Sequence, residues 1–304
     1  MQISYRIIDK KLEKTDPGKA SIWAFINPDE KEKRYLIDEI KIDEHTLNSA
    51  LDPDELSRLE FEPEHLALIF KRPKNYSGED KFLFKSASSG AFLFKDKLIL
   101  VLAEDIPLFE GVQFSRVLSP AHLLLKLIYS SIFHFLEHLK IISAISDDLQ
   151  NKINTAMENR HLYNLFALEK SLVYYLNSIN SNGALIEKLR LNAVKIGFTV
   201  EEIEFLDDIY IENSQCYKQA EIYSNILASL MDARASIVGN NLNVLMKTLN
   251  LITILIMVPT FVVSAFSMNV HIPLEDHPLA FWIILGLASL SVFGFILIWR
   301  HRRW

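Results

Sequence analysis

One stretch near the carboxyl end limits the fold of this chain more than any other. Residues Thr248 to Val270 carry no charge, and Lys247 borders them. At 1.5 Å per residue, about 20 apolar helical residues cross the hydrocarbon core of a bilayer. A second uncharged run extends from Leu279 to Trp299. We therefore expect two membrane-spanning helices joined by a short loop.

Polar, small and methionine side chains in and before the first run recur at steps of three and four. They are Asn243, Met246, Asn250, Thr253, Met257, Thr260, Ser264 and Ser267, and we call them the polar stripe. This spacing places them on one helical face. A single helix cannot enclose a pore, so the stripe predicts a channel lined by several copies of the chain. Helix packing is the alternative interpretation, because small and polar residues also line helix contacts in membranes.

The rest of the chain has the composition of an acidic globular protein. The net charge of the whole chain, −6 over 304 residues, argues against nucleic acid as a partner. The single Cys216 allows no intrachain disulfide and no cysteine-based metal cluster, which suits a reducing compartment. Charged residues interrupt the first ten positions, so we expect no signal peptide. We find no nucleophilic residue matched with a general base in the sequence, so nothing in it supports an enzyme.

Residues 1–118 are expected to form a cytoplasmic α/β domain with a mixed sheet, because short apolar runs alternate with charged helical stretches. The predicted strands are Ile3–Ile8, Ser21–Ile26, Leu66–Lys71, Phe82–Lys85, Ala91–Lys95 and Leu98–Ala103. The predicted helices are Glu30–Ile40 and Thr46–Asp52. Turns are expected at 75–78 and 88–90, where glycine follows small polar residues.

A cytoplasmic helical layer is expected over residues 119–198, beginning at Ser119 and Pro120. Its first helix should reach about Ala156, and its second should cover Arg160–Asn180 and stop at Ser181–Gly183. A stalk helix over 199–247 then starts with Thr199 as its cap and continues into the first span. The final part, 248–304, is a transmembrane hairpin.

Basic residues predict the orientation of this hairpin. Lys247 borders the first span, and Arg300, Arg302 and Arg303 border the second on the same side. The loop between the spans has no lysine or arginine and contains Glu275 and Asp276. The positive-inside rule therefore places both termini in the cytoplasm, with the acidic loop outside a cell (inner) membrane.

The carboxyl-terminal third resembles the CorA-type divalent cation transporters. The resemblance rests on Leu230–Ala233, Asn243–Lys247, the tripeptide Ser267–Asn269 and the basic tail. Members of that family carry Gly-Met-Asn at the end of the first span, so Ser267 is a departure from their pattern. The resemblance implies a CorA-like homopentameric funnel, in which the first spanning helices line a magnesium channel.

The resemblance also implies roles for individual residues. Asn243, Met257, Thr260 and Ser264 would face the pore, and Met246 and Leu249 would form a hydrophobic gate. Asn269, with Ser267 and Met268, would meet the hydrated ion at the entrance, and Asp232 would belong to an acidic ring at the cytoplasmic mouth. Asp207 and Asp208 lie at the level where the family binds regulatory Mg²⁺, although solvated stalk carboxylates are the other interpretation.

The chemistry of Mg²⁺ suits such a pore. This ion gives up its waters reluctantly, and uncharged oxygen ligands such as those of Asn250 and Thr253 can bind it through its hydration shell. Glu275 and Asp276 would concentrate cations at the mouth. Because Ser267 departs from the family tripeptide, the identity of the transported ion stays open, with Zn²⁺, Co²⁺ or Ni²⁺ as alternatives. His271 and His277 would suit Zn²⁺.

Two further histidines, His134 and His138, have the i, i+4 spacing of a metal-binding helix face, but they lack the glutamate of a zincin motif. Partly exposed helix histidines are therefore the preferred interpretation of these positions. Two functional alternatives to a passive channel remain from the sequence. One is a CorA-like zinc transporter driven by a proton gradient, and the other is a non-conducting membrane-anchored scaffold or sensor.

Overall fold

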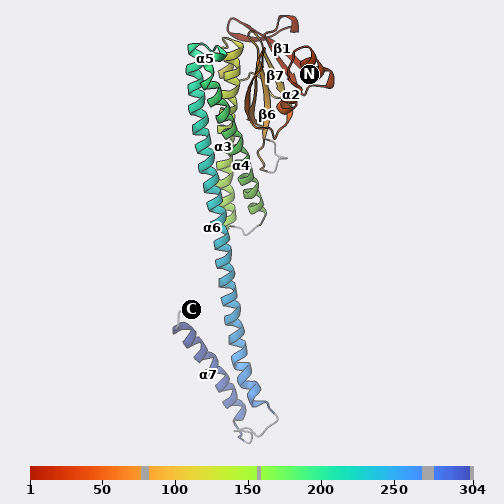
Figure 1. Ribbon diagram of the computed structural model, residues 1–304. Helices are drawn as coiled ribbons and strands as arrows, with labels where there is room; N and C mark the ends of the chain where they lie inside the picture. Colours follow the sequence, from red (N-terminus) through yellow and green to blue (C-terminus); the bar gives the residue numbers. More distant parts are fainter. Residues whose placement is uncertain (77–81, 156–158, 269–276, 302–304) are drawn as a thin grey trace. The chain divides into compact units, whose positions relative to one another are not determined.

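The computed structural model describes residues 1–76, 82–155, 159–268 and 277–301. The chain divides into two compact units, Met1–Ser229 and Leu230–Trp304. The amino-terminal unit contains a sheet and a layer of long helices, and the carboxyl-terminal unit contains only helices (Figure 1). Helix α6 contributes residues to both units.

The sheet has seven strands in the order β2-β1-β3-β7-β6-β5-β4. Their bounds are β1 Gln2–Ile8, β2 Lys11–Lys14, β3 Ile22–Ile26, β4 Arg58–Phe61, β5 Leu66–Pro73, β6 Ser86–Leu93 and β7 Leu98–Leu102. Strands β3 and β7 pair in parallel, and all other neighbours are antiparallel. The predicted mixed sheet is therefore confirmed.

Two strands of the sheet, β2 and β4, were not predicted from the sequence. Both are four residues long and rich in charge, and they form the two edges of the sheet. Charged side chains on short edge strands protect a sheet from pairing with other chains. The same charges remove the apolar alternation by which a strand is recognised in a sequence.

Helices α1 (Glu30–Asp38) and α2 (Glu44–Leu51) cover one face of the sheet. A buried cluster joins them to the strands, with Leu36 and Leu47 against Phe25, Phe92 and Val101. Both helices begin at an aspartate whose side chain accepts backbone N–H bonds, Asp29 and Asp43. Each such cap stabilises its helix by about 1 kcal/mol.

Two predictions near β6 were wrong. Phe82–Lys85 is not a strand, and Ser88–Gly90 is not a turn but the middle of β6. A Cβ atom on Gly90 would lie 2.5 Å from the Cβ of Ala50, so glycine lets α2 approach the sheet. The backbone N–H of Phe84 donates to Ser171 Oγ at 2.9 Å instead of to a neighbouring strand.

The opposite face of the sheet is covered by α3 (Pro120–Thr155) and α4 (Asn159–Leu191), as Figure 1 shows. The predicted end of α4 at Ser181–Gly183 was wrong, because the helix continues through these residues. Asn182 is fully buried and hydrogen-bonds to the backbone of β5, and a Cβ atom on Gly183 would lie 3.0 Å from Asn213 Nδ2. The small and polar residues serve packing here.

Short α5 (Ala193–Ile196) leads into α6 (Val200–Phe266). Thr199 caps α6 as predicted: Glu202 N donates to Thr199 Oγ1 at 3.3 Å, and Thr199 N donates to Glu202 Oε2 at 2.9 Å. The 67-residue helix is continuous through Pro259. Helices α6 and α7 (Ala280–His301) each contain a segment long and apolar enough to cross a membrane.

Candidate ion pathway

The carboxyl-terminal unit separates the apolar and polar faces of α6. The half-buried side chains of α6 in the apolar run recur on one face and are Leu251, Leu255, Val258, Pro259, Val262, Ala265 and Phe266. None of them belongs to the polar stripe. At about 100° per residue, this face and the stripe lie on roughly opposite sides of the helix.

Every residue of the polar stripe is exposed in the single chain. The predicted gate residues are exposed as well, with Met246 at 50% and Leu249 at 56%, and so is Met268. Exposed hydrophobic residues on a helix of this kind indicate contact with lipid or with other protein chains. The stripe is therefore available to line a space between copies of the chain.

The hydroxyl groups of the stripe have a defined direction of hydrogen bonding. Thr253 Oγ1 donates to Leu249 O at 2.9 Å, and Thr260 Oγ1 donates to Ile256 O at 2.6 Å. Ser267 Oγ donates to Ser264 O at 2.9 Å. The hydroxyl protons of these three residues are thus used within the helix, and their oxygen lone pairs remain as acceptors. Acceptors suit a hydrated cation, because its outer surface consists of water O–H donors.

Asn250 and Thr253 also border a groove between α6 and α7. Phe295 and Trp299 of α7 form the other side of this groove, and Leu251 and other apolar residues of α6 complete it. These two stripe residues are therefore close to α7 as well as to the exposed face. The remaining stripe residues do not line this groove.

Several predicted site residues lie outside the polar stripe. Asp232 is exposed on α6. Asn269, Glu275 and Asp276 lie outside the described residues, as does His271. For these positions the sequence-based roles stay predictions.

The two candidate regulatory carboxylates differ in their surroundings. Asp207 Oδ1 lies 2.5 Å from Arg190 Nε, and the Arg190 guanidinium also lies over the ring of Tyr210. Asp208 is exposed, and the described part of the chain offers it no ion pair. Among the described residues of one chain, no three His, Cys, Asp or Glu side chains form a group that could hold a metal.

The histidine pair of α3 is engaged in hydrogen bonds. His134 Nε2 and His138 Nε2 lie 3.0 Å apart, and His138 Nδ1 lies 2.6 Å from Tyr175 Oη. Burial lowers the pKa of His138 to about 4, and burial also lowers the pKa of His134. The prediction of partly exposed helix histidines fits His134 but was wrong for His138, which is buried.

Known proteins resemble this chain in sequence and in fold. Over 290 residues the chain is 25% identical to the cobalt/magnesium transport protein CorA of Methanocaldococcus jannaschii. This match covers 91% of this chain and 89% of that protein. The complete structure of the CorA magnesium transporter from the same organism superimposes with a TM-score of 0.82 at 20% identity, covering 99% of this chain and 97% of the other.

The structure of the full-length CmaX protein is also similar, with a TM-score of 0.72 at 14% identity, covering 100% of this chain and 97% of the other. Residues 18–302 match the family described as CorA-like Mg²⁺ transporter protein. This match extends over nearly the whole sequence. The chain therefore belongs to the CorA-like Mg²⁺ transporter family.

Proposed function

We propose that the chain forms a homopentameric, passive channel for divalent cations, and that Mg²⁺ is its principal ion. The family is one of ion transporters, so the chain is a transporter and not an enzyme. The observation that carries the proposal is the polar stripe of α6, which is exposed on the side facing away from the half-buried apolar face. Five such stripes would enclose a pore lined by uncharged oxygen acceptors.

These acceptors allow an ion to pass with its water shell. Mg²⁺ loses water reluctantly, so rings of Asn250, Thr253, Thr260 and Ser264 would bind it through its waters. The span contains no carboxylate that would hold a divalent ion too tightly. A membrane potential of about 100 mV, negative inside, favours entry of a doubly charged ion by about 4.6 kcal/mol. Influx then needs no other energy source.

The membrane placement follows from the same proposal. Residues 248–304 form the hairpin in a cell (inner) membrane, with both termini in the cytoplasm. Asn269, Ser267 and Met268 then stand at the outer entrance, and Glu275 and Asp276 concentrate cations there. Residues 199–247 form the stalk, and residues 1–118 and 119–198 form the cytoplasmic α/β domain and helical layer.

Gating is assigned to the inner end of the pore. Rings of Met246 and Leu249 would form an apolar constriction that closes by losing water, with Asn243 and Asp232 on its cytoplasmic side. Asp208 is the better candidate for a regulatory Mg²⁺ shared between subunits, because Arg190 already pairs with Asp207 in the same chain. Release of such an ion would loosen the subunit contacts and open the gate.

Ion flux into proteoliposomes tests the channel. Under a negative-inside potential, we expect wild type to take up Mg²⁺, with competition from Co²⁺, Ni²⁺ and Zn²⁺. Ser267→Gly, which restores the family tripeptide, should increase the preference for Mg²⁺ over Zn²⁺. Uptake of none of these four ions would contradict the proposal.

Ser267 favours a second candidate, a zinc transporter driven by a proton gradient. That candidate predicts uptake of Zn²⁺ that depends on a pH difference and not on the potential alone. A non-conducting scaffold or sensor is a third, and it predicts that Asn269→Ala leaves cellular ion content unchanged. The channel predicts instead that this variant lowers the cellular content of Mg²⁺.

A further inference from the structure

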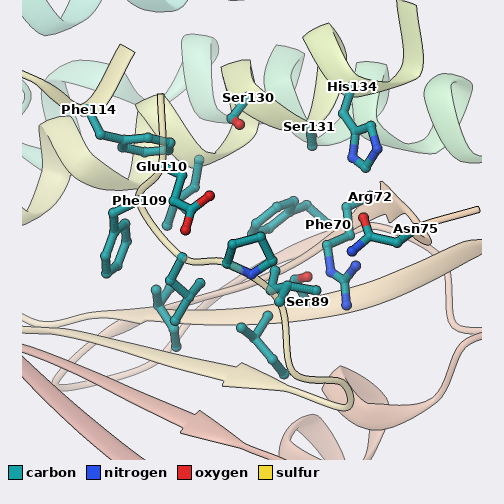
Figure 2. A pocket seen from close by; sticks show the side chains of 16 residues that line it. Phe70, Arg72, Asn75, Ser89, Phe109, Glu110, Phe114, Ser130, Ser131 and His134 are labelled. Carbon is teal, nitrogen blue, oxygen red and sulfur yellow. The ribbon is translucent and has the colours of Figure 1, made fainter. Parts of the chain in front are cut away.

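The amino-terminal unit contains a cavity of about 160 Å³ between the sheet and α3. Phe70, Ser89 and Leu102 are aligned across β5, β6 and β7 and form its floor. Residues at steps of three and four on α3, from Leu127 to His134, form its roof, and residues 106–110 close one side. Figure 2 shows Arg72, Asn75 and His134 at one end of the cavity and Phe109 and Phe114 at the other.

The polar end contains buried hydrogen-bond donors without acceptors. Arg72 is 7% exposed and Ser89 is 1% exposed. Arg72 Nη1 donates to Pro73 O, but Arg72 Nε, Arg72 Nη2 and Ser89 Oγ have no hydrogen-bond partner among the described residues. A buried polar group without a partner costs about 1–3 kcal/mol, so three of them in one cavity require an explanation.

One nearby carboxylate balances part of the charge of Arg72. Arg72 Nη2 forms an ion pair with Glu104 Oε2 at 3.6 Å, which is longer than a hydrogen bond, and Lys74 binds the other oxygen of Glu104. Glu110 lines the cavity but is exposed. Arg72 therefore retains donors for an additional acceptor. The two glutamates also add negative charge, which favours a ligand with one negative charge over a ligand with two.

A chain of hydrogen bonds holds His134 in place at this end. The hydroxyl of Tyr175 is fully buried and lies 2.6 Å from His138 Nδ1, and His138 Nε2 lies 3.0 Å from His134 Nε2. This chain engages Nε2 of His134, so Nδ1 is the ring nitrogen left for a ligand. The ring of His134 lies beside Arg72 and Asn75 in Figure 2.

The rest of the cavity is mostly apolar, with Glu110, Ser130 and Ser131 as its polar lining residues, and its volume limits the size of a ligand. Its other residues include Phe70, Leu100, Leu102, Phe109 and Phe114. A cavity of about 150 Å³ with such a lining accommodates benzene. The space thus suits one ring or a short branched chain, with a charged group at the end where Arg72 and Ser89 lie.

We propose that this cavity binds a small monocarboxylate with a short apolar or single-ring tail, whose carboxylate accepts hydrogen bonds from Arg72 and Ser89. Arginine and carboxylate form paired, parallel hydrogen bonds, which would satisfy the guanidinium donors. The tail would lie between Phe70 and Phe109, under α3. This site is separate from the proposed ion pathway and does not depend on it.

Binding of benzoate to the full-length protein in detergent tests the proposal, with isothermal titration calorimetry as the readout. We expect saturable binding with one site per chain. Arg72→Gln and Ser89→Ala should each weaken binding at least about fivefold, because each removes a donor to the carboxylate. Benzamide, which has the same ring without the charge, should bind at least about tenfold more weakly.

Ser89→Ala keeps the proposal testable if Arg72→Gln does not fold, because it removes only a hydroxyl that has no partner. Arg58→Gln is the matched control: Arg58 pairs with Glu55 and Glu60 and does not line the cavity, so benzoate affinity should be retained. Absence of saturable benzoate binding would overturn the proposal. So would equal binding of benzamide, tighter binding of inorganic phosphate, or an affinity unchanged in both Arg72→Gln and Ser89→Ala.

Discussion

Asn182 fixes α4 to the sheet through a single amide. Its Oδ1 accepts from Lys71 N and its Nδ2 donates to Lys71 O, both at 2.8 Å, and Ser57 Oγ donates to the same Oδ1 at 2.7 Å. Pairing between β4 and β5 ends at Ile69 of β5, so Lys71 has no neighbouring strand on that side. The amide therefore takes the place of a strand.

Replacement of this amide should destabilise the protein strongly. We expect Asn182→Ala to lower the free energy of unfolding by about 2–4 kcal/mol, because it leaves two buried backbone groups of Lys71 unpaired. Thermal or denaturant unfolding of the purified protein measures the change. The control is Asn192→Ala: its half-buried side chain bonds, among the described residues, only to Lys188 O, so its loss should cost well under half as much. Equal effects of the two variants would contradict this role.

Buried histidine predicts a dependence of stability on pH. Burial lowers the pKa of His138 to about 4, whereas an unfolded histidine has a pKa near 6.5. The unfolded state therefore binds more protons between these values, so stability is complete above pH 6.5 and falls as the pH decreases towards 4. We expect His138 to account for a loss of about 3 kcal/mol between pH 7 and pH 4. Burial lowers the pKa of His65, His122 and His134 in the same direction.

Unfolding measured across this pH range tests the contribution of His138. His138→Gln should lower stability at pH 7, where it disturbs Tyr175 and His134, but should flatten the loss on acidification. His45→Gln, at an exposed histidine, should leave the pH profile unchanged. A wild-type slope in the His138→Gln variant would assign the loss to other groups.

At the scale of elements, α6 presents matched threonines on different faces. Thr248 and Thr260 both donate Oγ1 to the carbonyl oxygen four residues earlier. Thr260 belongs to the polar stripe, whereas Thr248 lines the groove beside α7. The two threonines lie on different faces of α6 and at different positions along it, but they have the same side-chain chemistry.

Thr260→Val therefore tests whether the stripe lines the ion path. It removes an oxygen from every subunit, and we expect Mg²⁺ uptake into proteoliposomes to fall about tenfold or more, since a loss of 1.4 kcal/mol is tenfold. Thr248→Val should retain uptake within about twofold. Melting temperature and oligomer size should be similar for the two variants. If Thr248→Val reduced uptake as strongly as Thr260→Val, the stripe would not be the lining.

Elements with a strong periodic or uncharged pattern were predictable from the sequence. The start of α6 at Thr199, its continuity and a second long apolar helix were confirmed because capping residues and long uncharged runs act locally. The charged edge strands β2 and β4 were missed because pairing defines them. The end of α4 was predicted wrongly because Asn182 and Gly183 bond and pack with residues that are distant in the sequence.

The candidate sites divide in the same way. The polar stripe was visible because its residues repeat on one helix. The cavity near Arg72 was not, because its residues come from β5, β6, β7, residues 106–110 and α3. One sequence feature could have pointed to it: the apolar run 66–70 is followed directly by Lys71 and Arg72 within a single strand, Leu66–Pro73.

At the scale of the whole molecule, the proposal requires stripes from neighbouring copies to face one another. The chain suits a cysteine test, because Cys216 is its only cysteine. Cys216 is fully buried, and burial raises the pKa of its thiol to about 12, so the reactive thiolate is scarce at neutral pH. A new cysteine on α6 would therefore be the reactive thiol of the chain.

Met257→Cys should form disulfide-linked dimers in membranes after mild oxidation, because side chains that face a narrow pore at one level lie close together. Native mass spectrometry of the unoxidised variant should give five chains per particle. Ile252→Cys, at an exposed position off the stripe, should cross-link much less. Equal cross-linking at both positions would show that the stripe does not face the symmetry axis. A particle with another number of chains would show that the proposed pentamer is wrong, and the cross-linking result would still test the position of the stripe.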